Sequence, residues 1–366
     1  LQRWSHLDLE KDSIPGMSVD KAYSELLKGK KGAKVVVGVI DSGVDINHPD
    51  LKSVIWTNKK EIPNNKKDDD KNGYADDVHG WNFLGDSNNE TLELVRYLRK
   101  GDDGTELYKK AQKEYEKEYN EVFPYKETVD LLADADKTIR EYLKKDNYTK
   151  EDLNNIASVK YDLFRSKKIM LMYAEDAGDN FRESLEEFKE YVYDKLNYNL
   201  NKEFDGRKIV GDNPEDIKDN HYGNNIVFGP DKEKALHGTH VAGIIAQIRG
   251  NNLGGDGVAS PNVEILTVRA VPDGDEYDKD IALAIAKKVR DQLKESLPST
   301  RVIMTRSDDT FIELYRRGHI ANQYKGKLFI SIHCNAAPSK PHPANGFEVY
   351  VLRPGKTKDA IRVAER

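Results

Sequence analysis

The chain has 366 residues, which is enough for two domains or for one large core with a long insertion. Charged residues make up 33% of it, yet the formal net charge is only −6, so it lacks the basic excess of a nucleic-acid-binding protein. It has no run of about 18 apolar residues that could span a membrane, and its single cysteine, Cys334, excludes an intrachain disulfide.

The first predicted element is a strand over residues 35–40. Five of these six residues are β-branched and no charge interrupts them, which predicts a strand buried on both faces of a parallel sheet. The fold class expected is therefore α/β. Asp41 follows the strand directly, at the carboxyl end where functional side chains gather in open α/β sheets. Alone, an aspartate in this place is more often a turn or cap residue.

An acidic loop follows at residues 68–80, with the sequence DDDKNGYADDVHG. Oxygen-bearing side chains alternate there around a glycine, a pattern that suits Ca²⁺ with its six to eight hard ligands. His79 stands where an EF-hand loop has its bidentate glutamate, so the match is partial, and a solvated acidic turn is the alternative. The expected calcium ligands are Asp68, Asp70, Asn72 and Asp76.

Residues 91–205 differ in amino-acid composition from the residues on either side. Lys, Glu, Tyr and Leu recur at helical spacing and Gly and Pro are nearly absent, which predicts a charged insertion of several helices. Its tyrosine stripe is interpreted as packing. We divide the chain into an Asp41-bearing part, this insertion, a His237-bearing part and a last α/β segment, at residues 1–90, 91–205, 206–279 and 280–366.

The stretch HGTHVAGIIAQI begins with His237, and small and apolar residues follow at 241–246. These residues predict a tightly buried helix that holds the imidazole at the edge of the sheet. An aspartate from a neighbouring strand end, such as Asp41, would fix the imidazole tautomer, as a general base in acyl transfer requires.

Together, DSGVDINHPDL, HGTHVAGIIA and GVASPNVEILTVRAV resemble the subtilisin-like serine proteases, over roughly residues 1–285. The resemblance implies a three-layer fold around a parallel sheet, with Asp41 orienting the imidazole, His237 as general base and His240 in a structural role. It also implies protein or peptide substrates, and calcium sites occur often in this family.

The sequence departs from that family after His237. The family needs a nucleophilic serine in a Gly-Thr-Ser-Met-Ala-type turn and an asparagine that helps to hold the oxyanion, and neither motif occurs. Ser42 stands beside Asp41, Ser260 lies in a turn before a strand, and Ser331 belongs to a different motif. The catalytic set is therefore predicted to be incomplete and the chain inactive or nearly so.

The last part of the chain has another pattern: RVIMTR, then L-x-x-R-x-x-x-A-N, then KLFISIHCNA. These motifs resemble the zinc-dependent N-acetylmuramoyl-L-alanine amidases over roughly residues 280–366. The resemblance implies a Zn²⁺ ligand at His333, with Asp278 where the family has a longer glutamate, and peptidoglycan as substrate. The family's Gly-His-Gly-Gly turn is missing. Cys334 is discounted as a ligand because adjacent strand residues face opposite ways.

The predicted helix at residues 274–296 suits both families at its start and only the amidases at its end, which places a join near residues 278–286. A join of two gene fragments is the favoured interpretation, because natural fusions usually connect whole domains. Three functions stay open: an incomplete serine endopeptidase, a zinc amidase of the cell wall, and a non-catalytic scaffold that uses the insertion as a contact surface.

The chain begins at Leu1 and shows no signal-peptide pattern, so we interpret it as a processed or truncated product. By resemblance, the expected location is secreted, periplasmic or in the cell envelope of a bacterium.

Overall fold

The computed structural model describes residues 3–157, 160–216, 219–277, 279–281, 320 and 323–324. The chain divides into two compact units, one made of Leu1–Gly211 with Gly223–Glu276 and the other of Asp212–Tyr222 with Tyr277–Arg366. Within the described residues, no helix is both long and apolar enough to cross a membrane.

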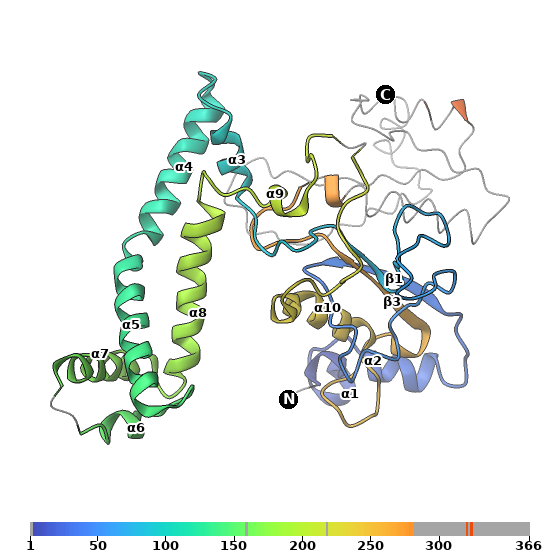
Figure 1. Cartoon of the computed structure of the whole chain (residues 1–366). Coiled ribbons are helices and arrows are strands. Elements are labelled where there is room, and N and C mark those ends of the chain that lie inside the picture. Colours follow the sequence, from blue (N-terminus) through green and yellow to red (C-terminus); the bar gives the residue numbers. More distant parts are fainter. Residues whose placement is uncertain are drawn as a thin grey trace. The chain divides into compact units, whose positions relative to one another are not determined.

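The first unit is built on a parallel sheet of strand order β1-β3-β2 (Figure 1). Its strands are β1 (Val35–Asp41), β2 (Gly80–Asn82) and β3 (Val263–Arg269). Both pairings are parallel, and the register sets Arg269 opposite both Asp41 and Asn82. The predicted α/β class with a parallel sheet is thereby confirmed, and three polar side chains stand in one row at the carboxyl end of the sheet.

The expected burial of β1 on both faces is wrong for its first half. Val35 is 55% exposed and Val36 36% exposed, whereas Val39 is buried. Among the described strands β1 pairs only with β3, so it forms an edge, and its packed residues share a core with Ala242 and Ala246. Apolar content predicted the strand, but burial depends on which elements cover it.

The helix that carries His237 is α10 (Leu236–Ala246). Ala242 and Ala246 are fully buried against the sheet, but Ile244 is 49% exposed. The predicted tight burial therefore holds for the face that packs on the sheet, and the opposite face is exposed at Ile244. The small residues lie on the covered face, where they allow close approach to the sheet.

The long insertion is helical, as predicted, and has a core of its own (Figure 1). Helices α5, α7 and α8 pack together around Ile139, Met170 and Leu185, which are fully buried. In α4 and its C-cap, stacked rings join Tyr115 to Tyr119 and Tyr119 to Phe123, so these aromatic residues are engaged in packing. The helices are α3 (Glu93–Arg99), α4 (Glu106–Val122), α5 (Tyr125–Leu143), α6 (Lys150–Asn154), α7 (Tyr161–Ala177) and α8 (Phe181–Asp194), followed by the π-helix η3 (Lys195–Asn199).

Short elements complete the first unit. They are η1 (Trp4–His6), α1 (Leu9–Asp12), α2 (Val19–Lys21), the π-helix η2 (Ala22–Leu26), α9 (Arg207–Val210), η4 (Lys232–Ala235) and η5 (Ser260–Asn262).

In the second unit, the described residues 212–222 contact the start of the helix predicted at 274–296. Lys279 Nζ donates to Asp212 Oδ2 at 2.7 Å and to the Asn213 carbonyl at 2.7 Å. The Tyr222 hydroxyl donates to the Asp280 carboxylate, which is fully buried. Most of the predicted join lies outside the described residues.

Candidate active site

Asp41 and His237 meet at the carboxyl end of the sheet. Asp41 is the last residue of β1, His237 is the second residue of α10, and 2.7 Å separates the His237 Nδ1 from the Asp41 Oδ1. A carboxylate only accepts, so Nδ1 of the neutral imidazole carries the proton and Nε2 is left as an acceptor. The Asp41 side chain is 13% exposed and the His237 side chain 77%, so a largely buried carboxylate contacts an exposed imidazole.

Close approach of two backbone segments makes this pair possible. Gly43 has φ +112°, a conformation that favours glycine, and its carbonyl lies against Gly238 of α10. Further along the same loop, the Asp45 amide donates to Thr239 Oγ1 at 2.9 Å, and the Gly238 amide donates to Ser42 Oγ at 3.4 Å. The residues around Asp41 and the first turn of α10 are thus joined at several points.

A pocket opens beside the pair. Besides Asp41 and His237, its lining includes Asn88, Lys234, Arg269 and Asp273. His240, one turn further along α10, is exposed and does not contribute to this lining. The two histidines of HGTH therefore occupy different surroundings, and only His237 stands beside a carboxylate in the pocket.

The last helix of the insertion reaches the wall of this pocket. Lys234 forms ion pairs with Glu190 and, at 3.1 Å, with Asp194 Oδ2 of α8. Burial, together with a hydrogen bond to the Asp194 carboxyl, raises the pKa of Asp273. A carboxyl whose pKa is raised in the folded state favours folding while it is protonated. The stabilising contribution of the Asp273–Asp194 hydrogen bond is therefore lost as pH rises through the raised pKa of Asp273.

None of the serines described in the structure hydrogen-bonds to His237. Ser42 lines the pocket, but its amide donates to the Asp41 carboxylate at 2.7 Å and its hydroxyl accepts from Gly238. Ser260 is buried at the start of η5. Ser331 lies outside the described residues. The geometry thus presents a carboxylate in contact with an imidazole, and no described serine hydrogen-bonded to that imidazole.

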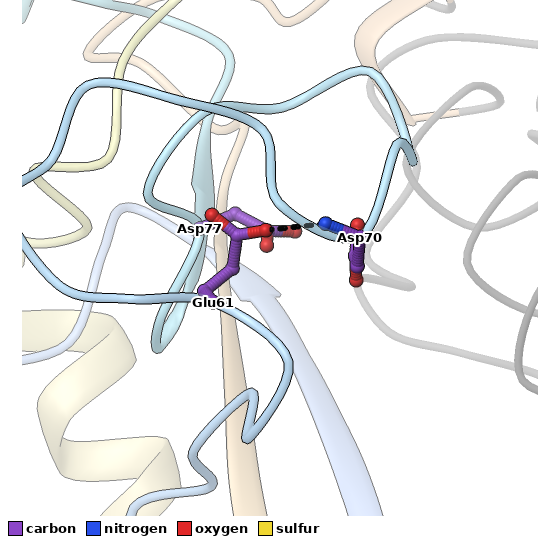
Figure 2. Close-up of side chains that lie close together, drawn as sticks. All are labelled: Glu61, Asp70 and Asp77. Atoms are coloured by element: carbon purple, nitrogen blue, oxygen red, sulfur yellow. Dashed lines mark hydrogen bonds between the residues drawn. The ribbon is translucent and has the colours of Figure 1, made fainter.

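Two carboxylates of the acidic loop, Asp70 and Asp77, lie close to the carboxylate of Glu61, which precedes the loop (Figure 2). Their ligand atoms lie within 4.8 Å of one another. The Asp70 amide donates to Glu61 Oε1 at 3.0 Å, and the Asn58 side-chain amide donates to both Asp70 and Asp77. The donor set is one of hard oxygens, as a divalent cation of the calcium type requires.

Of the four expected calcium ligands, only Asp70 contributes to this cluster. Asp68 accepts from the Asn72 and Gly73 amides, and Asp76 accepts from two backbone amides of the preceding turn, so both carboxylates hold the loop in shape. The Asn72 side chain donates to Asp77. Alternating spacing identified the loop but not which of its carboxylates converge.

Sequence reasoning missed Glu61, Asp77, Lys234 and Arg269. Arg269 carried a readable signal, since it is the one basic residue of the mostly apolar strand VEILTVR and stands at its carboxyl end. Asp77 is adjacent to Asp76, so an alternating pattern of ligands shifted by one residue at that point includes it. Glu61 and Lys234 carried no such signal, because each is one charged residue among many.

The residues expected to bind zinc, His333 and Asp278, lie outside the described residues, as does Cys334.

Asp41 and His237 thus form a carboxylate–imidazole pair from adjoining elements at the carboxyl end of a parallel sheet. Two family models match the chain, the subtilase family over residues 32–295 and the N-acetylmuramoyl-L-alanine amidase family over residues 266–366. Since the first match covers more than half of the chain, the chain belongs to the subtilase family. The second match covers less than a third of the chain, and the overlap of the two matches includes the join expected near residues 278–286.

Curated relatives of this chain include proteins named as a subtilisin-like protease and as an N-acetylmuramoyl-L-alanine amidase. Subtilisin-like protease 1 of Plasmodium falciparum is 47% identical over 66 residues, which are 18% of this chain and 10% of that protein. The endolysin of Bacillus phage SPP1 is 44% identical over 73 residues, 20% of this chain and 25% of the endolysin. A probable N-acetylmuramoyl-L-alanine amidase of Haemophilus influenzae is 34% identical over 85 residues, 23% of this chain and 19% of the amidase. The chain spans no more than a quarter of the length of these three relatives.

Proposed function

We propose that residues 32–295 are the Asp- and His-bearing part of a subtilisin-like serine endopeptidase. The observation that carries this proposal is the 2.7 Å contact between His237 Nδ1 and Asp41 Oδ1 at the carboxyl end of the sheet. His237 Nε2 would take the proton of a serine hydroxyl as that oxygen attacks a peptide carbonyl. The imidazolium, stabilised by Asp41, would then return the proton to the leaving amine, and water would hydrolyse the acyl-enzyme.

As written, the chain supplies this pair without the serine motif that the family places after the histidine. We therefore propose that it is incomplete as a protease. Its substrate class would be proteins or peptides, met outside the cytoplasm or in the cell envelope.

The proposal that the catalytic set lacks its serine can be tested with a fluorophosphonate probe, which reacts with serines activated by a general base. The full chain is expected to remain unlabelled, while a complete subtilase in the same reaction is labelled. A control with His237→Ala separates activated from incidental labelling. If a serine of the full chain were labelled and that labelling disappeared in His237→Ala, the proposal of an incomplete site would be wrong.

We propose further that the Glu61, Asp70 and Asp77 cluster binds Ca²⁺ as a structural ion. Burial raises the pKa of Glu61, so without a cation the carboxyl ionises less readily in the folded chain than in the unfolded one. Folded-state stability is then greatest below the ordinary glutamate pKa and falls as pH rises through the raised one. A bound cation would remove that loss, because it favours the ionised form.

Calcium is therefore expected to raise the unfolding temperature of the full chain at neutral pH. At a concentration about 100 times the dissociation constant, the gain would be roughly 2.7 kcal/mol. Asp70→Asn should remove most of this gain, while Asp69→Asn, a change in the neighbouring carboxylate outside the cluster, should preserve it. An equal response of both variants to calcium would contradict the site.

A second candidate function rests on the amidase match at residues 266–366. We propose that this segment derives from a zinc-dependent enzyme acting on peptidoglycan, with His333 as a zinc ligand and Asp278 in the place of a second. Three protein ligands with an open fourth position are usual for catalytic zinc, and this chain matches the family firmly at one. Purified chain is expected to hold far less than one zinc ion per molecule by mass spectrometry. A full equivalent that is lost in His333→Ala would instead establish a complete site.

A further inference from the structure

Arg269 is a buried cation at the centre of the site whose role the proposed reaction leaves unassigned. It is the last residue of β3 and is 2% exposed. Among the described residues, no carboxylate forms an ion pair with its guanidinium. Burial lowers the pKa of Arg269 to about 10, so the side chain keeps its charge at neutral pH. A buried charge without an ion-pair partner is costly unless hydrogen bonds satisfy it.

Five oxygen atoms converge on the guanidinium, which has five N–H donors. Two are side-chain oxygens of Asn82 and Asn88, at 3.0 Å and 2.8 Å. The others are the backbone carbonyls of Ser42 at 3.1 Å from Nε, Gly85 at 3.3 Å from Nη1 and Ser87 at 2.7 Å from Nη2. Arg269 thus joins the loop after β1 to the loop after β2.

The surrounding backbone is shaped to admit this side chain. A Cβ added at Gly229 would lie 2.6 Å from Arg269 Nε, and one added at Gly43 would lie 3.2 Å from Arg269 Cδ. Both glycines have positive φ. An apolar side chain of similar length would leave the carbonyls of Ser42 and Ser87 without this donor, and a buried acceptor without a partner is expensive. The Gly85 carbonyl would keep the Asn82 side-chain amide as a donor at 2.8 Å.

The contact to Ser42 leads directly to the catalytic pair. Arg269 Nε donates to the Ser42 carbonyl, the Ser42 amide donates to Asp41 Oδ1, and the same oxygen contacts His237 Nδ1. The Asp41 carbonyl in turn accepts from the amides of Ala270 and Val271, which follow Arg269. Side chain and main chain at the end of β3 thus hold the backbone on which the Asp41 carboxylate depends.

We propose that Arg269 is a positioning residue that fixes the Asp41–Ser42 backbone and thereby the carboxylate that orients His237. This inference rests on the proposed roles of Asp41 and His237. A structural role alone would affect stability, whereas a positioning role also affects which imidazole nitrogen carries the proton.

The test is nitrogen NMR of the full chain labelled with ¹⁵N-histidine, which reports the ratio of Nδ1–H to Nε2–H tautomers of neutral His237. The His237 signal is assigned by its loss in His237→Gln. In the unmodified chain the Nδ1–H form is expected to predominate. Arg269→Met should lower the ratio about fivefold, the loss expected of one hydrogen bond, and Arg269→Lys should lower it less because one donor and the charge remain.

Arg182→Met is the matched control. Arg182 is a largely buried arginine of the insertion that contacts Asp136, so its loss should reduce stability without changing the His237 tautomer. If folded Arg269→Met keeps the ratio of the unmodified chain, the positioning role is wrong. If Arg269→Met fails to fold, Arg269→Lys decides by the same criterion, with Arg182→Lys as its control.

A different variant tests the proposed function independently of the role of Arg269. Asp41→Asn removes the ionised acceptor itself, so a tautomer ratio that is equal in Asp41→Asn and in the unmodified chain would show that the pair does not orient the imidazole. That outcome would remove the basis of the proposed protease chemistry, whatever Arg269 does.

Discussion

His237→Ala is expected to abolish peptide hydrolysis in a chain whose residues after Glu276 are replaced by the serine-bearing part of a complete subtilase. The expected fall in kcat is about 10⁶-fold, because the base and the serine act as a unit and either alone achieves little. The structure supports this choice of residue, since the imidazole that contacts Asp41 at 2.7 Å is His237. The replacement begins after Glu276 because the first compact unit ends there.

His240→Ala is the matched control in the same chain. Its histidine is an exposed residue of the same helix and does not line the pocket, so kcat is expected to change less than about threefold, as for surface substitutions that leave stability within roughly 0.5 kcal/mol. Rates with a chromogenic peptide and unfolding temperatures would be measured for both variants. Equal losses in the two variants, with the fold retained, would show that His237 is not the general base.

Gly238→Ala is expected to destabilise the chain by about 1–3 kcal/mol and to separate His237 from Asp41. A Cβ at this position would lie 2.1 Å from the Gly43 carbonyl oxygen and 3.0 Å from Asp41 Cβ. Neither the Gly43 backbone nor α10 can yield at that distance without shifting. The helix would move away from the loop after β1, and the 2.7 Å contact would lengthen.

Gly243→Ala in the same helix separates this clash from the general effect of replacing a glycine. The nearest atom to its added Cβ is a flexible side-chain oxygen of Gln247 at 3.5 Å, so the substitution has room. Alanine is the better helix former, and the variant should be stabilised by about 0.5–1 kcal/mol. Denaturant unfolding measures both changes. A Gly238→Ala chain as stable as Gly243→Ala would mean that α10 is not held closely against Gly43.

The sequence was informative where a local pattern fixes a local structure. The β-branched run predicted β1, and the small and apolar residues after His237 predicted α10. The specific motifs around Asp41 and His237 predicted that two residues 196 positions apart meet, as they do. The change of motif after residue 278 predicted a second family, and the match over residues 266–366 agrees.

Sequence patterns predicted less well which residues are buried and which carboxylates lie close together. The strand β1 was expected to be covered on both faces, but Val35 and Val36 are exposed, because coverage depends on elements distant in sequence. The Asp68 and Asp76 carboxylates accept hydrogen bonds from backbone amides of their own region. The carboxylates that lie close together are those of Glu61, Asp70 and Asp77.

The sequence by itself therefore determined the family, which aspartate and histidine meet, and the absence of the family's serine motif. Only the tertiary structure decided which carboxylates form a cluster and that the lone arginine of β3 supports Asp41. The physical reason is that the hydrogen bonds of Arg269 reach five oxygen atoms, one at the end of β2 and four in the loops after β1 and β2. No periodicity along the chain encodes which loops come together, because their meeting is fixed by the register of the sheet between them.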